Sequence, residues 1–153
     1  MDRIDIQVDD REVQVALGRA RQRLANTRPL MAGIASLMLE TVEDAFDQER
    51  DPTTGAPWPR LSRRTIEQRS KAKKWPGRIL QASGQLAVSV SSTHNDTSAT
   101  VSTNKVYARI HQFGGPAGRG HKARLPERPY LGLGSRDKTA IVEQVEKHIS
   151  LTG

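Results

Sequence analysis

The sequence contains no cysteine, which excludes disulfides, thiolate nucleophiles and cysteine-ligated zinc. Aromatic residues make up only 4% of the chain, so we expect a core built from aliphatic side chains. The longest apolar run, residues 34–39, includes a serine and is far shorter than the roughly 20 residues of a membrane helix. Acids stand at the start of the chain, where a signal peptide carries bases. We therefore expect a protein of the cytoplasm, or of a particle assembled there, with no membrane partner.

The chain has 153 residues, which corresponds to a single domain over residues 1–153. A compact fold of this size buries roughly 70% of the surface that the unfolded chain exposes. Hydrophobic residues are only 35% of the composition, and the mean hydropathy is −0.62. This thin supply of apolar side chains favours a protein that completes its burial against a partner subunit.

The net charge of +7 is distributed unevenly along the chain. Residues 1–59 hold 7 Lys/Arg against 11 Asp/Glu, residues 60–128 hold 14 against 3, and the last 25 hold 3 against 3. The sequence therefore predicts one strongly basic surface and one mildly acidic surface, which would attract a polyanion or the acidic face of a neighbouring copy. The alternative is a solvated basic surface that only keeps the protein soluble.

Apolar residues at three- and four-residue steps predict helices in the first and last parts of the chain. Asp9 and Asp10 would cap a first helix, and Pro29 would end or kink it. A second helix of about 20 residues carries an apolar stripe opposite a row of acids at 40–47. Asp137 would cap a final helix. Shorter helices are expected at 62–73 and at 106–113, the second of them stopped by Gly114 and Gly115.

Alternation of apolar and polar residues predicts short strands. Residues 1–8 are typical of an N-terminal strand or arm. Residues 86–90 and 99–103 flank a polar turn and predict an antiparallel hairpin, and residues 129–133 could add a third strand. Residues 114–128 are rich in glycine and arginine and are expected to form a flexible loop. Together these elements predict an α+β fold, with two long N-terminal helices and a C-terminal helix packed on a small, mainly antiparallel sheet.

The histidines and carboxylates do not assemble into a motif of known chemistry. No two histidines have the spacing that places two metal ligands on one helix face, and His94 lies in a predicted turn. His111, beside Tyr107 and Phe113, suits a buried histidine bonded to a carbonyl as well as a catalytic group. No nucleophile elbow and no phosphate-binding glycine loop occur. We therefore predict no enzyme activity, no catalytic residue, no metal and no cofactor, with a metal nuclease using His111 as the least favoured alternative.

Four sequence blocks in the middle and C-terminal parts of the chain resemble one protein family. In order, they are Trp58-Pro59-x-Leu61-Ser62, Ile79-Leu80-x-x-Ser83-Gly84-x-Leu86, Tyr107-Ala108-x-Ile110-His111-Gln112-Phe113-Gly114-Gly115 and Arg128-Pro129-Tyr130-Leu131-Gly132-Leu133. This series is similar to the virion morphogenesis, or tail completion, family of tailed bacteriophages such as Mu and P2. The resemblance covers about residues 55–150, and the occurrence of all four blocks in series makes it fairly specific.

The resemblance implies a non-enzymatic virion subunit at the neck or at the head-proximal end of the tail. By analogy with other neck and tail-tube components, it implies a homo-oligomer, a six-fold ring through which the genome passes. Its partners would be neighbouring neck, connector or tail-tube proteins, with non-specific contact to packaged DNA. It would lie in the host cytoplasm during assembly. The loop between Gly115 and Arg128 varies within the family, so the resemblance assigns no role to its residues.

Two sets of residues are candidates for intermolecular contact. Large or apolar side chains of the blocks are candidates for a subunit or partner interface, or for packing within the chain: Trp58, Leu61, Tyr107, His111, Phe113, Arg128 and Tyr130. The basic side chains that would face DNA or an acidic partner are Arg63, Arg64, Lys73, Lys74, Arg119, Lys122 and Arg124. The alternative function is a basic nucleic-acid-binding protein, a free monomer or dimer, that uses residues 60–78 and 119–128.

Overall fold

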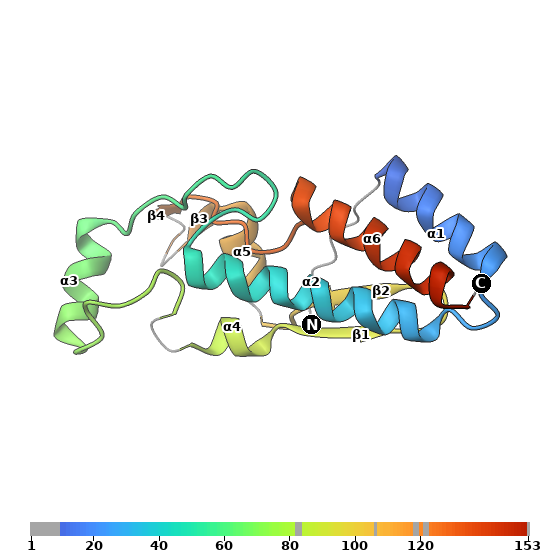
Figure 1. The fold of residues 1–153 in the computed structure, drawn as a ribbon. Coiled ribbons are helices and arrows are strands. Elements are labelled where there is room, and N and C mark those ends of the chain that lie inside the picture. The colour runs from blue at the N-terminus through green and yellow to red at the C-terminus, as the bar shows by residue number, and fades with distance from the viewer. Residues whose placement is uncertain (1–9, 82–83, 106, 118–119, 121–122, 153) are drawn as a thin grey trace.

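The computed structural model describes residues 10–81, 84–105, 107–117, 120 and 123–152, and it confirms the predicted α+β fold (Figure 1). The helices are α1 (Arg11–Arg23), α2 (Arg28–Gln48), α3 (Arg63–Lys71), α4 (Gln85–Ser89), α5 (Ala108–Phe113) and α6 (Ser135–Thr152). The strands form two antiparallel pairs, β1 (Ser91–His94) with β2 (Ala99–Ser102) and β3 (Gly115–Ala117) with β4 (Ala123–Leu125). The strand or arm predicted at residues 1–8 lies outside the described residues.

The first two helices form where their periodicity predicts them, but the first one ends earlier than expected. Asp10 caps α1, and its side-chain oxygen accepts a hydrogen bond from the Val13 N–H at 3.1 Å. Helix α1 ends at Arg23, so the prediction that Pro29 ends or kinks this helix is wrong. Pro29 instead lies in the first turn of α2, where its fixed φ suits a helix start and its missing N–H costs no hydrogen bond.

Helix α2 is the central element because its two halves enter two different hydrophobic clusters. The N-terminal half packs with α1 and α6 in an aliphatic cluster of Val13, Ala16, Ala20, Leu24, Leu30, Met31, Ile34, Leu133, Ile141 and Val145. The C-terminal half enters a second cluster of Val42, Ala45, Phe46, Trp58, Ile79, Leu86, Val90, Ala108, Tyr130 and Leu131. Three of the six aromatic residues gather in the second cluster, so the expectation of an aliphatic core holds for the first cluster only.

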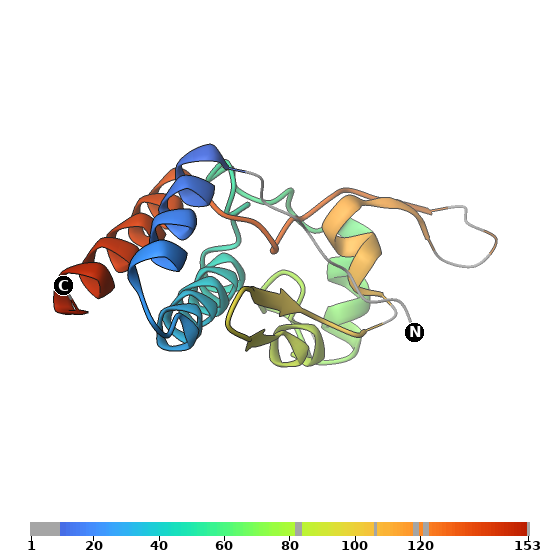
Figure 2. The ribbon, with the colours of Figure 1, turned by 90° about the vertical axis from the view of Figure 1, so that its right-hand side faces the viewer.

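The layers follow from this central position of α2. Figure 2 shows α1 and α6 on one side of α2 and the β1–β2 hairpin on the other. The hairpin pairs Ser91 with Ser102 at one end and His94 with Ala99 at the other. Its turn is fixed by Asn95, whose side-chain oxygen accepts from the N–H groups two and three residues further on, at 2.8 Å each. The predicted turn is therefore confirmed over residues 95–98, whereas His94, which was predicted to lie in it, is the last residue of β1.

The prediction that residues 86–90 form the first strand of the hairpin is wrong. Residues 86–89 belong to helix α4, Val90 follows the helix, and the strand begins only at Ser91. Leu86 and Val90 are buried, whereas Val88 is 83% exposed. In a strand all three would share one face, but four-residue spacing brings only Leu86 and Val90 together on a helical turn. The alternation of apolar and polar residues was misleading because a segment of five residues is too short to distinguish the two-residue period of a strand from the 3.6-residue period of a helix.

Residues 114–128, predicted as a flexible loop, contain a short strand pair in the parts that the structure describes, and their flexibility stays a prediction. Gly114, with φ of 70°, ends α5 as predicted, and the bond from its N–H to the Ile110 carbonyl is 2.7 Å long. A Cβ at this glycine would meet the Glu127 nitrogen at 2.7 Å, so the chain needs glycine here for space as well as for conformation. Strands β3 and β4 then pair, which corrects the prediction of a loop for the parts of the segment that the structure describes.

Residues 129–133 do not form the predicted third strand. Pro129 has no N–H to give to a neighbouring strand. The N–H groups of Tyr130 and Leu131 both donate to the side-chain oxygen of Gln112 at 3.0 Å. A buried side chain therefore takes the role that a neighbouring strand would have taken.

The molecule is elongated, with α3 at one end, away from the helices α1, α2 and α6 (Figure 1). The chain exposes 10089 Å² of surface. A compact monomer of this mass would expose only about 7,700 Å². The helices of the described part of the chain include none that is both long and apolar enough to cross a bilayer.

Candidate functional site

Parts of the four family-like blocks converge beside the C-terminal half of α2. The rings of Phe46 and Trp58 meet edge-on with centroids 5.8 Å apart, and those of Phe46 and Tyr130 lie 5.2 Å apart. Trp58 is 3% exposed and Tyr130 is fully buried. Aromatic pairs at such distances add stabilisation beyond the area that they bury. The blocks thus supply the largest side chains of the second hydrophobic cluster.

The polar atoms of these aromatic residues are all used within the chain. The Trp58 Nε1–H donates to the Pro129 carbonyl at 2.6 Å, and the Tyr130 hydroxyl donates to the Ala108 carbonyl at 2.8 Å. Burial raises the pKa of the Tyr130 phenol well above its usual value, so the hydroxyl keeps its proton and remains a donor. Three blocks are joined by these two bonds.

Gln112 is the residue at the centre of this arrangement, and it was missed by the sequence analysis. It is 5% exposed, accepts from the N–H groups of Tyr130 and Leu131, and donates through Nε2 to the Leu131 carbonyl at 3.0 Å. One amide side chain thus satisfies three backbone groups that would otherwise be buried without partners. Its place between two candidate residues, His111 and Phe113, was the signal available in the sequence.

Arg128 is buried at 4% exposure and links two segments that are distant in sequence. Its Nε donates to the Pro59 carbonyl at 2.9 Å, and its Nη2 donates to the Arg60 carbonyl at 3.0 Å. Its backbone N–H donates to the His111 carbonyl at 2.7 Å. Burial, together with the charge of Arg69, lowers the pKa of Arg128, and Glu49 partly opposes that effect. This guanidinium fixes the start of the chain segment that leads to α3.

The remaining interface candidates lie closer to the surface. His111 packs edge-on against Tyr107, with ring centroids 6.0 Å apart, and burial with the nearby Arg128 charge lowers the pKa of its imidazole. The contact that the structure shows for this imidazole is the ring contact with Tyr107, rather than the carbonyl hydrogen bond that was one of the two interpretations left open by the sequence. Phe113 is 49% exposed, and the Arg109 guanidinium lies 5.2 Å above its ring. Leu61 is half-buried against the second cluster.

For the first candidate set, the structure therefore shows packing within the chain at Trp58, Arg128 and Tyr130, which was one of the two readings that the sequence left open. Contact of these residues with a partner stays a prediction, and their burial leaves little surface for it. Phe113, whose side chain is about half exposed, is the member of this set that is most available for contact with a partner.

Residues 60–78, which we call the basic arm, contain eight Lys/Arg and one Glu. The arm holds α3, which Ser62 caps by accepting from the Thr65 N–H at 3.2 Å, and α3 has no buried residue. Arg69 donates to the Arg78 carbonyl at 2.7 Å and Arg78 donates to the Asp47 carbonyl, so the base of the arm is tied to the end of α2. The predicted helix at 62–73 is confirmed with slightly shorter bounds.

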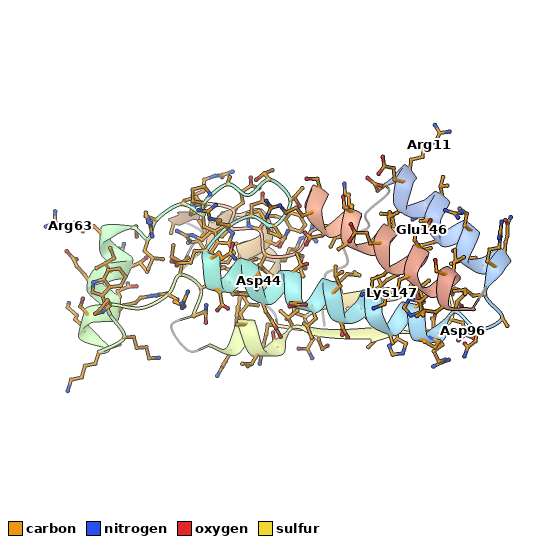
Figure 3. All side chains as sticks on the ribbon, in the orientation of Figure 1. Arg11, Asp44, Arg63, Asp96, Glu146 and Lys147 are labelled. Atoms are coloured by element: carbon orange, nitrogen blue, oxygen red, sulfur yellow. The ribbon has the colours of Figure 1, made fainter. Side chains whose placement is uncertain are left out.

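The basic candidates are placed as follows. Arg63, Arg64, Lys73 and Lys74 are exposed on the basic arm, and Figure 3 shows Arg63 at the far end of the molecule. Arg124 is exposed on β4. Arg119 and Lys122 lie outside the described residues.

Four exposed acids of α2, which we call the acidic face, are Glu40, Glu43, Asp44 and Asp47. Glu40 with Asp44, and Glu43 with Asp47, are like-charge pairs four residues apart, each of which destabilises a helix by about 0.2–0.5 kcal/mol. The face also lies toward the negative end of the helix dipole, and the last turn has no basic residue to offset it. The acids are therefore placed where they reduce the stability of the isolated helix.

A polar depression of about 500 Å³ lies next to the acidic face. Asp44, Asp51 and Asp137 contribute carboxylates to its lining, and Arg50 and Arg136 contribute guanidiniums. Asp51 and Asp137 are used locally, since they accept backbone hydrogen bonds from Thr53 and Gly134. Within the described residues, no group of three or more histidine and carboxylate side chains could hold a metal ion.

The fold and these surfaces define a small α+β protein whose sequence blocks hold its own chain together and whose exposed features are two surfaces of opposite charge. That arrangement is typical of an assembly or binding protein. The chain belongs to the phage virion morphogenesis family, whose sequence model matches residues 8–150. It therefore has a structural or assembly role in the making of phage particles.

Two curated relatives are similar over nearly the whole chain. The Mu-like prophage FluMu G protein 2 of Haemophilus influenzae is 35% identical over 149 residues, which is 97% of each chain. The putative capsid assembly protein G of Escherichia phage Mu is 32% identical over 148 residues, which is 96% of this chain and 94% of that protein. No solved structure matches the chain. The family resemblance inferred from the four blocks is thus confirmed.

Proposed function

We propose that the chain is a non-enzymatic structural subunit of a ring at the head–tail junction of a tailed phage, needed for assembly and for passage of the genome. In this role it is a homo-oligomer, six-fold by analogy, and it contacts neighbouring neck, connector or tail-tube proteins. The Mu relative is named as a putative capsid assembly protein, which is compatible with a position next to the head.

The observation that carries the proposal is the separation of two opposite charges on one chain. The basic arm lies at the end of the elongated molecule, and the acidic face lies on α2 (Figure 3). Two different surfaces that complement each other make a head-to-tail contact, and such a contact closes into a ring when its rotation permits.

The exposed surface of the chain supports the same proposal. The 10089 Å² that it exposes exceeds the expectation for a compact monomer by roughly 2,400 Å². A protomer in a ring has two neighbours, and a standard interface buries about 800 Å² on each partner. The chain therefore has enough surface for two such interfaces.

Electron microscopy and sedimentation of the purified chain test the proposal directly. We expect closed annuli of one size, formed by the chain alone or on mixing with tails or connectors that lack it. A monomer at all concentrations and salts, with no annulus on mixing, would contradict the proposal.

The eight cations of the basic arm also favour the second candidate function, nucleic-acid binding by the free chain. A gel-shift titration separates the two functions. Sub-micromolar binding of DNA by the monomer at physiological salt would favour the second candidate, and its absence would favour the ring subunit.

A further inference from the structure

We propose that the basic arm of one copy docks on the acidic face of α2 in the next copy, and that this contact joins the protomers. The inference rests on the proposed function, because it names the contact that closes the proposed ring. The occupant of the acidic face is thus a second copy of this chain.

Within the part of the chain that the structure describes, helix α3 is held at its C-terminal end, where Arg69 donates to the Arg78 carbonyl at 2.7 Å, and its N-terminal end carries exposed arginines. None of its residues is buried, and its ion pair joins Arg63 to Glu67 within the same helix at 3.4 Å. The base of the arm meets the end of the acidic face in its own chain, because Arg78 donates to the Asp47 carbonyl. The far end of the arm does not, since Figure 3 places Arg63 at one end of the molecule, away from Asp44 on the central helix. A nine-residue helix that buries nothing is marginal in water by itself, and contact with another element would stabilise it.

The first turn of α3 and the C-terminal part of α2 each carry charges opposite to those that the helix dipole favours at that end. Arg63 and Arg64 occupy the first turn of α3, where the dipole is positive and no acid is present. Asp44 and Asp47 occupy the C-terminal part of α2, where the dipole is negative and the last turn has no base. Each arrangement is unfavourable in the isolated chain, and contact between the two neutralises both at once.

The arm also carries an apolar anchor for such a contact. Trp75 is 39% exposed, although tryptophan is a residue that proteins usually cover. Tryptophan and arginine are the residues most enriched among those that dominate interface energies. The depression lined by Asp44, with a volume of about 500 Å³, offers a concave surface beside the acidic face.

A second copy fits these observations better than DNA does. If the arm bound DNA alone, the acidic face would gain no cation from it, and its carboxylates would repel the phosphates near them. Arm-to-face contact uses both surfaces of every protomer in a closed ring. DNA as the occupant of the arm is therefore the competing outcome of the test.

Charge reversal on each surface tests the contact. We expect R63E/R64E and D44K/D47K each to weaken self-association at least tenfold by sedimentation at low salt. Both changes place charges where the helix dipoles favour them, so loss of the folded monomer is not expected. Thermal unfolding followed by circular dichroism checks that the variants keep their fold.

The quadruple variant R63E/R64E/D44K/D47K reverses the charge on both surfaces, so that their signs are again opposite. This variant gives the most direct test of the pairing. We expect it to recover annuli that neither double variant forms. A folded quadruple variant that stays monomeric would overturn the proposed pairing.

The matched control is R21E/R23E, which makes the same change of charge on two exposed residues at the end of α1. We expect this control to assemble like the unmodified chain.

If R63E/R64E assembles as well as the unmodified chain but loses DNA binding, DNA is the occupant of the arm. The inference is then wrong, while the proposed ring remains. If the unmodified chain itself never forms a ring, it is the proposed function that fails.

The absence of cysteine allows a second test by cross-linking. In the variant R64C/D44C a short bismaleimide should join neighbouring protomers into a ladder that stops at the size of the ring. The pair R23C/D44C is the control and should give no ladder. A ladder from the control that equals the one from R64C/D44C would count against the contact.

Discussion

At the scale of single residues, Gln112 connects α5 to the segment that carries Tyr130. We expect Gln112→Leu to leave the N–H groups of Tyr130 and Leu131 and one carbonyl buried without partners. Each such group costs about 1–3 kcal/mol, so the free energy of unfolding should fall by about 3 kcal/mol or more. Urea denaturation measures the change. The control Gln22→Leu, on the exposed side of α1, should stay within about 0.5 kcal/mol of the unmodified chain.

His111 gives a prediction on pH. Because burial and the Arg128 charge lower the pKa of its imidazole in the folded state, the unfolded chain takes up a proton first as the pH falls. Stability is therefore complete above the ordinary histidine pKa of about 6.5 and decreases on acidification below it, by at most about 1.4 kcal/mol per pH unit for one group.

The measurement is the urea midpoint between pH 7.5 and pH 5.5, compared with His111→Phe. Phenylalanine keeps an aromatic ring to pack against Tyr107 but cannot titrate. We expect the slope to be smaller in the variant. Equal slopes in both proteins would show that other groups cause the pH dependence.

At the scale of elements, helix α4 can be told from the predicted strand by two substitutions. In the helical arrangement Val88 faces solvent and Leu86 is buried. We expect Val88→Asp to change stability by less than about 0.5 kcal/mol, and Leu86→Ala to cost about 2–5 kcal/mol. Thermal or urea unfolding measures both. A strand would place both side chains on one face and make both substitutions costly.

At the scale of the whole molecule, the charge separation predicts association that weakens with salt. Raising the ionic strength from 0.1 M to 1 M shortens the Debye length from about 10 Å to about 3 Å, which screens exposed ion pairs. Several such pairs are expected at each proposed contact, so the apparent dissociation constant should rise by about tenfold or more. Sedimentation at a series of salt concentrations measures it. An oligomer that strengthens with salt would point to an apolar interface instead.

The sequence by itself determined the elements whose physical signal is local. The 21-residue helix α2 follows from its long apolar stripe. Asp10 marks the start of α1, and Gly114 marks the end of α5. The uneven distribution of charge follows from a count of residues. The family was also found from the sequence, because its four blocks lie in a fixed order.

Only the tertiary structure decided what those blocks do. The bonds that join Trp58, Gln112 and Arg128 to distant carbonyls span 71, 19 and 69 residues, so no local pattern reveals them. The same is true of Pro29 and Val88, whose places depend on which neighbours cover them. Burial and hydrogen bonding between distant segments are properties of the folded chain, whereas periodicity, capping and charge are already present in the order of its residues.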